Sequence, residues 1–357
     1  MKRFSIFAVV LVTALTPAIK ASEQLIPTAA SCSACTPGNC VCATGCGCAL
    51  TGHDYFTHAP IGVMGDHIHH KGGLMASYRY MFMSMQRNYN GDSQISDAAA
   101  RAGYMMNATE MDMQMHMLGV MYAPTDQLTL MLMGNYLDSS MPMVNMMGVK
   151  NTMRSSGYGD TTLSAYYSLF KERNSSAHVG LGLSIPTGSI DEKMPNGLHM
   201  GYPMQLGSGT WDLKPSITWL GHTEDWSYGG QFSAVIRLGE NDNGYTLGDR
   251  ISATGWISRR LSARSSVSLR LVATSWSNVD GSDSKMPVTI MGGPMAAPVD
   301  PDAQGGSRVD LALGLNLWHT ESGARFAIEA GAPVYQKLDG PQLGTEWFMT
   351  AGFQFGW

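Results

Sequence analysis

Apolar and polar residues alternate with a period of two along most of the chain after residue 70. In one segment, Leu311, Leu313 and Leu315 alternate with Asp310 and Gly314. Successive side chains of a β-strand point to opposite faces, so each such segment predicts a strand with one apolar face. Twelve segments follow the pattern: 74–85, 111–122, 127–136, 160–170, 177–186, 211–219, 226–238, 245–258, 265–276, 307–318, 324–333 and 346–357.

The connections between these segments also follow a pattern, in which long and short alternate. The long ones are 86–110, 137–159, 187–210 and 277–306, and the short ones are 123–126, 171–176, 220–225, 259–264 and 319–323. Outer-membrane barrels have short periplasmic turns and longer outer loops, which is the arrangement expected here if both termini are periplasmic. Two connections fit less well, because 239–244 is short where a long loop is due and 334–345 is of medium length.

These observations predict an all-β fold over residues 74–357, an antiparallel transmembrane β-barrel of about twelve strands. A soluble β-sandwich is the alternative. It would not be expected to keep aliphatic residues on the same parity of nearly every strand while the other face stays polar. The chain ends on Trp357, whose strand carries Trp347, Phe353 and Phe355 on the same face, as a closing strand of an outer-membrane barrel would.

The N-terminus predicts export. Lys2 and Arg3 precede a mostly apolar run from Phe4 to Leu15, and small residues follow as far as Ala21. This is the layout of a signal peptide, assigned to residues 1–21. The run is too short to span a bilayer as a helix. The predicted location is the cell outer membrane, with its lipid as a partner.

Composition narrows the class of function. Charged residues make up 14 % of the chain, which is sparse for a large water-facing surface, and the formal net charge is −5. Nucleic-acid binding needs a basic footprint and is therefore not expected. No phosphate-binding glycine motif, nucleophile elbow or marked Ser/His pair occurs in the sequence. We therefore expect no enzyme activity.

The chain contains 27 methionines, and the strand parity predicts where many of them point. On the first three predicted strands the inward positions include Met81, Met83, Met85, Met113, Met115, Met117, Met131 and Met133. Methionine is a flexible apolar filler, so these side chains would line a passage for apolar molecules. Thioethers are also soft ligands that suit Cu(I), so the same ladder would offer weak copper sites. Both interpretations stay open at this stage.

The predicted inner face also carries charge. Its charged residues are Arg79, Asp212, Lys214, Arg237, Arg250, Arg270, Arg308, Asp310, Arg325 and Glu329. On the lipid face a charged residue at mid-membrane would cost about 2–4 kcal/mol, whereas a water-lined pore tolerates it. The alternative is that these groups pair with one another across the barrel and fill it.

Residues 22–73 lack strand alternation and form a predicted irregular periplasmic extension. It contains every cysteine of the chain: Cys32, Cys35, Cys40, Cys42, Cys46 and Cys48. An even number of cysteines in an exported protein suggests disulfides, but the tight spacing also suits a metal thiolate cluster. His67, His69 and His70 follow, and an extended backbone would put His67 and His69 on one face. Imidazole suits copper, zinc and nickel alike, so we assign these residues to a candidate metal site with copper as the candidate ion.

The stretch from Ser156 to Tyr167, SGYGDTTLSAYY, resembles the G-x-G-D-x-x-L-x-x-x-Y motif of the outer-membrane transporters linked to meta-pathway phenol degradation. The stretch from Gly180 to Gly188 is similar to the following strand of that family and its P-T-G loop entry. Residues 59–67 and 77–81 resemble a methionine-rich subgroup. The resemblance covers residues 70–357 and implies a porin-like or hydrocarbon-uptake barrel.

The sequence therefore predicts an outer-membrane transporter or channel for small apolar or aromatic solutes, with a link to copper handling. Alternatives are a copper-binding or efflux-associated barrel, and a structural or adhesion barrel without transport. The expected partners are membrane lipid and a small-molecule solute or metal ion.

Overall fold

The computed structural model describes residues 55–357 except 290, 320 and 321. The predicted signal peptide and all six cysteines lie outside the described residues. No described helix is long and apolar enough to cross a membrane. The helical elements are α1 (Asp97–Arg101), η1 (Tyr55–Thr57), η2 (Tyr202–Met204), η3 (Ala297–Val299) and η4 (Pro301–Ala303). The strands are β1 (Leu74–Gly91), β2 (Ser93–Ile95), β3 (Met106–Ala108), β4 (Glu110–Tyr122), β5 (Leu128–Asn145), β6 (Lys150–Tyr158), β7 (Thr161–Lys171), β8 (Ser175–Ile185), β9 (Trp211–His222), β10 (Trp226–Leu238), β11 (Tyr245–Thr246), β12 (Arg250–Ser262), β13 (Ser265–Trp276), β14 (Asp280–Gly281), β15 (Gly306–His319) and β16 (Ala324–Gly356).

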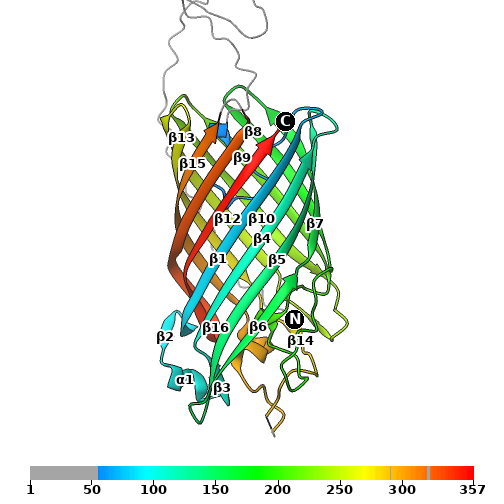
Figure 1. Ribbon diagram of the computed structural model, residues 1–357, viewed down its shortest axis with the longest axis vertical. Coiled ribbons are helices and arrows are strands. Elements are labelled where there is room, and N and C mark those ends of the chain that lie inside the picture. The colour runs from blue at the N-terminus through cyan, green and yellow to red at the C-terminus, as the bar shows by residue number, and fades with distance from the viewer. Residues whose placement is uncertain (1–54, 290, 320–321) are drawn as a thin grey trace, which may run out of the picture. The chain divides into compact units, whose positions relative to one another are not determined.

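The long strands close into a barrel, as the sequence predicts (Figure 1). The ring runs β1-β4-β5-β7-β8-β9-β10-β12-β13-β15-β16 and returns to β1. Every neighbouring pair in this ring is antiparallel. The closure leaves no exposed sheet edge, which a barrel in lipid requires because unpaired backbone groups cannot be hydrated there.

β16 supplies two of the barrel walls. Residues from Ala324 to Leu338 pair with β15, and residues from Leu338 to Gly356 pair with β1. Between them the chain reverses near Gly340, whose φ of +74° favours glycine. A ring in which all neighbours are antiparallel closes only with an even number of strands. Counting both parts of β16, the eleven strands of the ring provide about twelve wall segments, the number expected from the alternation.

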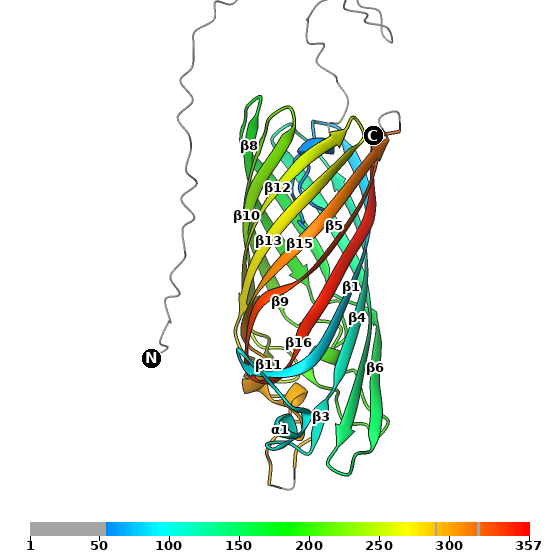
Figure 2. The same ribbon diagram turned by 90° about the vertical axis from the view of Figure 1, so that its left-hand side faces the viewer.

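The two ends of the barrel differ in their connections (Figures 1 and 2). At the end that also holds Trp357, here called the short-turn end, the chain reverses in turns such as the one between β4 and β5. At the other, the long-loop end, α1, β2, β3, β6, β11 and β14 lie in the connections. Short turns face the periplasm in bacterial outer-membrane barrels, so the long-loop end is assigned to the outside.

Most strand boundaries agree with the sequence prediction, and the differences at β5 and β6 share one cause. β5 was expected to end at residue 136 but continues to Asn145, and β6 was not expected. In the added part of β5, Met141 and Met143 are buried inside, while Asp138 lies on the outer face. Beyond the bilayer the outer face meets water, so the apolar-outside pattern that reveals a membrane strand is no longer present there.

The expected strand at 245–258 is also divided. β11 pairs with β14 outside the barrel, and the wall strand β12 begins only at Arg250. The connection after β10 therefore spans residues 239–249, which removes the short outer loop that did not fit the pattern.

Side-chain exposure confirms the expected parity. Leu118 and Leu132, on the lipid face, are 67 % and 53 % exposed, whereas the inward Met75, Met121 and Met131 are 7 % exposed or less. The lipid-facing surface is apolar, and the interior is filled by methionine and polar side chains. The fold is thus an outer-membrane barrel with an occupied lumen.

Candidate functional site

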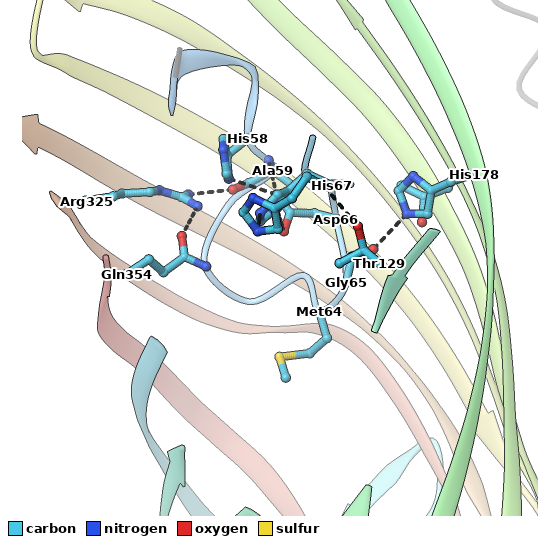
Figure 3. Close-up of polar contacts among 12 residues, drawn as sticks. His58, Ala59, Met64, Gly65, Asp66, His67, Thr129, His178, Arg325 and Gln354 are labelled. Atoms are coloured by element: carbon cyan, nitrogen blue, oxygen red, sulfur yellow. Dashed lines mark hydrogen bonds and ion pairs between the residues drawn. The ribbon is translucent and has the colours of Figure 1, made fainter. Parts of the chain in front are cut away.

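A segment ahead of β1 enters the barrel at its short-turn end. Residues 56–69 of this segment are here called the plug. Phe56, Ala59, Ile61 and Val63 are at most 2 % exposed, so the plug packs inside the lumen (Figure 3). The sequence assigned these residues to a periplasmic extension. The structure instead places this described part of the extension in contact with the barrel wall.

Polar side chains from four strands hold the backbone of the plug. Arg325 of β16, Gln231 of β10 and His178 of β8 each donate a hydrogen bond to a plug carbonyl, and Thr129 of β5 accepts one from a plug N–H. These bonds are Arg325 Nη2 to Ala59 O at 2.6 Å, Gln231 Nε2 to Met64 O at 2.9 Å, His178 Nε2 to Gly65 O at 2.8 Å, and His69 N to Thr129 Oγ1 at 3.0 Å. Because the partners lie around the ring, the plug is fixed from several sides.

Two glycines let the plug approach the wall closely. A Cβ added at Gly62 would lie 2.3 Å from Arg270 Nη2, within the ion pair that Arg270 forms with Glu329. Gly65 has a φ of +59°, and a Cβ there would lie 2.3 Å from the ring of Tyr166. Both positions therefore require glycine, one for space and the other for space and backbone conformation.

His58, Asp66 and His67 meet in the plug (Figure 3), and His69 lies next to His67. Asp66 Oδ1 accepts a hydrogen bond from His67 Nδ1 at 2.8 Å, and Asp66 Oδ2 accepts one from the Ala59 N–H at 3.0 Å. On its other side, His67 Nε2 lies 3.2 Å from His69 Nε2. The ring of His58 lies 4.0 Å from that of His67, measured between centroids. Among the described residues, His58, Asp66 and His67 are a group whose ligand atoms all lie within 4.8 Å of one another, close enough to hold a metal ion.

Burial and neighbouring charges set the ionisation of this cluster. Burial by itself would raise the pKa of Asp66, but His67 and His58 hold the pKa of this carboxyl well below its usual range. Burial lowers the pKa of His58 well below its ordinary value of 6.5, and the neighbouring His67 lowers it further. These shifts favour the ionised carboxylate of Asp66 and the neutral imidazole of His58.

The structure separates the histidines of the predicted metal site. His67 and His69 come together as expected, but the His70 side chain is 76 % exposed and its Nδ1 lies 3.7 Å from Asp126 Oδ1. His70 is therefore not part of the cluster. The predicted cysteine ligands lie outside the described residues, so their role stays a prediction.

Most of the predicted inward methionines form pairs across strands, and Met141 and Met153, which were expected in a loop, form a further pair. The pairs that stand directly opposite in register are Met75 and Met121, Met81 and Met115, Met83 and Met113, Met85 and Met111, Met121 and Met131, and Met141 and Met153. Residues directly opposed on antiparallel strands have Cβ atoms roughly 4.5–5.5 Å apart, within reach of two thioethers. Near the plug, Met117, Met131 and Met133 line a small cavity together with His67.

The long-loop end holds a second group of buried methionines and two cavities. One cavity of about 180 Å³ is lined by Met106, Met143, Met153, Met194 and Met295. The other, of about 100 Å³, is lined by Met85, Met111, Asn88, Asn107 and Leu343. Met141 and Pro298 border both cavities, so the two adjoin. Neither lining contains a charged side chain.

Several predicted inner charges pair with each other. Arg237 bonds with Asp212, Arg270 with Glu329 and Arg308 with Asp310. Asp212 and Glu329 are each 1 % exposed. Six of the ten residues are therefore paired, but each pair lies within one strand or between strands no more than two apart in the ring, so the pairing runs along the wall and not across the barrel.

A family model described as "Putative MetA-pathway of phenol degradation" matches residues 84–335. The chain belongs to this family. The resemblance seen in the sequence motifs is thereby confirmed. A search of curated protein sequences returns no significant match.

One solved structure supports the fold of this family member, and two others are more distant. The crystal structure of an outer membrane channel from Pseudomonas putida F1 has a TM-score of 0.57 at 15 % identity, covering 82 % of this chain and 98 % of that chain. A Pseudomonas aeruginosa FadL homologue has a TM-score of 0.41 at 8 % identity, with 79 % and 90 % covered. The KdgM porin has a TM-score of 0.38 at 10 % identity, with 79 % and 98 % covered. The protein is an outer-membrane barrel, located in the cell outer membrane.

Sequence reasoning missed the anchoring residues and part of the cluster. Arg325 was expected in the lumen but not on the plug, and neither His178 nor Gln231 was singled out. His58 and Asp66 were not assigned to the metal site. The two glycines of Ile61-Gly62-Val63-Met64-Gly65 were the available signal, because closely spaced glycines between apolar residues mark a backbone that approaches another surface.

Proposed function

We propose that this outer-membrane barrel is a channel that takes up small apolar or aromatic solutes through its long-loop end. The observation that carries the proposal is the pair of adjoining uncharged cavities, of about 180 Å³ and 100 Å³, at that end. Ligand pockets for small molecules are concave and mostly apolar with a few placed polar groups, here the asparagines. An apolar cavity of roughly 150 Å³ is large enough to take benzene.

The methionine lining favours aromatic molecules. A thioether is flexible and polarisable, and its contact with an aromatic ring contributes about 0.3–1.5 kcal/mol. The adjoining cavity reaches Met85 and Met111, one of the pairs that line the wall between the long-loop end and the plug. A solute bound at the outer end therefore has a methionine surface leading inward.

Toluene binding by the detergent-purified full chain tests the proposal, measured by titration calorimetry. We expect saturable binding with a negative heat-capacity change, the sign of apolar burial. Met143→Gln places an amide in the larger cavity, where Met143 is 1 % exposed, and should weaken binding about tenfold or more. Met147→Gln is the matched control, because Met147 is 85 % exposed and should leave binding unchanged.

Transport needs its own measurement. Uptake of radiolabelled toluene into vesicles whose outer leaflet is lipopolysaccharide should be faster with the wild-type barrel than with the Met143→Gln variant. If vesicles with the wild-type barrel, vesicles with the Met143→Gln variant and empty vesicles all take up toluene at the same rate, the channel proposal is wrong, even if toluene binds. In that case a structural or adhesion barrel, displaying its long loops, becomes the better description.

The paired methionines support a second candidate function, the passage of Cu(I). Six pairs of thioethers in register offer a row of weak soft-ligand sites along the wall. Changing Met81, Met83, Met113, Met115 and Met131 to Leu keeps the wall apolar and removes the sulfur. Loss of copper tolerance in cells carrying this variant, with toluene binding intact, would favour copper passage. Unchanged tolerance would leave the methionines as apolar lining.

A further inference from the structure

The plug contains a preorganised pair of imidazole nitrogens that the channel proposal does not use. His67 and His69 are two residues apart on extended backbone, so their side chains reach the same side. Their Nε2 atoms lie 3.2 Å apart, and the rings stand nearly perpendicular at 80°. His69 is 6 % exposed and its backbone is tied to Thr129 of β5, so the pair is held in the interior.

Asp66 settles which nitrogen of His67 is available. A carboxylate only accepts hydrogen bonds, so the Nδ1 of His67 that lies 2.8 Å from Asp66 Oδ1 must carry the proton. In the neutral ring with this tautomer, the lone pair of His67 is on Nε2, the atom that faces His69. The other oxygen of Asp66 is held by the Ala59 N–H. This is the arrangement found around metal-binding histidines, in which a carboxylate fixes the tautomer and orientation of the ring.

The spacing of the two nitrogens suits a shared ion. Nitrogens bound about 2.0–2.1 Å from one ion at a tetrahedral angle lie roughly 3.3–3.4 Å apart, close to the observed separation. His67 also borders a cavity of about 10 Å³, which has room for a single water-sized sphere. Six thioethers line this cavity, those of Met64, Met75, Met117, Met121, Met131 and Met133, and Arg79 also lines it and donates a hydrogen bond to Met64 Sδ. Imidazole combined with thioether suits Cu(I), because thioether is a soft ligand.

We infer that the plug holds one Cu(I) ion between His67 Nε2 and His69 Nε2, with a thioether from the adjoining cavity as third ligand. Met75, Met121 and Met131 are the candidate sulfur ligands, because they are buried and line the same cavity as His67. Asp66 is a positioning residue. The inference does not rest on solute uptake at the long-loop end, which involves other residues.

Cu(I) binding by the full chain tests the site, using competition with the chromophoric chelator bicinchoninate. The six cysteines are first reduced and alkylated, so that they do not contribute. We expect one tightly bound Cu(I) per chain and an X-ray absorption spectrum with nitrogen and sulfur ligands. His67→Ala should abolish this binding, and Asp66→Asn should weaken it by about 10- to 100-fold. His70→Ala is the matched control and should bind as the wild type does.

A second set of variants separates a ligand role from a folding defect. Met75→Leu, Met121→Leu and Met131→Leu conserve volume and packing, and one of them should remove the sulfur signal while the barrel keeps its heat-modifiable gel migration. The inference fails if no stoichiometric Cu(I) binds or if His70→Ala weakens binding as much as His67→Ala. It also fails if Zn²⁺ displaces Cu(I) or if the spectrum lacks sulfur. None of these failures bears on toluene binding at the long-loop end.

Discussion

Replacing Gly65 by alanine should unseat the plug, and the structure supplies a matched control at Gly72. Both glycines have positive φ, +59° and +82°, so alanine pays a similar backbone cost of about 1–2 kcal/mol at either position. The added Cβ at Gly65 would lie 2.3 Å from the Tyr166 ring, whereas nothing lies within 4 Å at Gly72. Only the first substitution forces the plug or the wall to move.

The size of the effect follows from the clash. Ordinary contact begins near 3.4 Å, so the Tyr166 ring or the plug must shift by roughly 1 Å. Overpacking of this kind costs about 1–3 kcal/mol. Because each 1.4 kcal/mol is a factor of ten, the population with the plug displaced should rise about 5- to 140-fold in Gly65→Ala relative to Gly72→Ala.

Hydrogen exchange of the plug amides measures that population directly. The peptide containing Val63, whose N–H bonds to Pro60 O at 2.9 Å, should exchange faster in Gly65→Ala by this factor. Planar-bilayer recordings should show more frequent openings in the same variant, because the displaced plug leaves the lumen. Equal exchange and equal opening in the two variants would refute the argument that the plug is seated by close contact with Tyr166.

Two further predictions concern buried charge. Arg270→Met leaves Glu329, which is 1 % exposed, without its partner and should lower the free energy of unfolding by about 3–5 kcal/mol, measured as the urea midpoint in detergent. The double variant Arg270→Met/Glu329→Leu should recover most of the lost stability. If Arg270→Met alone is as stable as the wild type, the pairing does not stabilise the barrel. At the long-loop end, His199 Nδ1 lies 2.7 Å from Asp283 Oδ2, and both side chains are 1 % exposed. His199→Phe should make the loops at 186–210 and 277–305 more sensitive to protease. The barrel itself should keep its heat-modifiable gel migration. Unchanged proteolysis would show that this contact does not hold the loops.

Much of the barrel was predictable because the pattern that builds it is local. Within lipid every strand meets the same solvent on its outer face, so each strand carries the same period-two signal and the signals add. The parity of Met81, Met115 and Met131 was therefore readable without any partner strand. The same reasoning failed for the outer part of β5, where the outer face meets water and Asp138 replaces the aliphatic residue.

The plug and its cluster were decided only by the tertiary structure. Arg325 and Ala59, which form one of the anchoring bonds, are separated by 266 residues, and His178 and Gly65 by 113. No local pattern encodes such contacts, because they depend on which strands the closed ring brings around the lumen. The sequence by itself determined a methionine-lined outer-membrane barrel and the pairing of His67 with His69 on one face. The tertiary structure buried this pair beside a methionine-lined cavity and left His70 exposed, and so decided which histidines could belong to the proposed copper site.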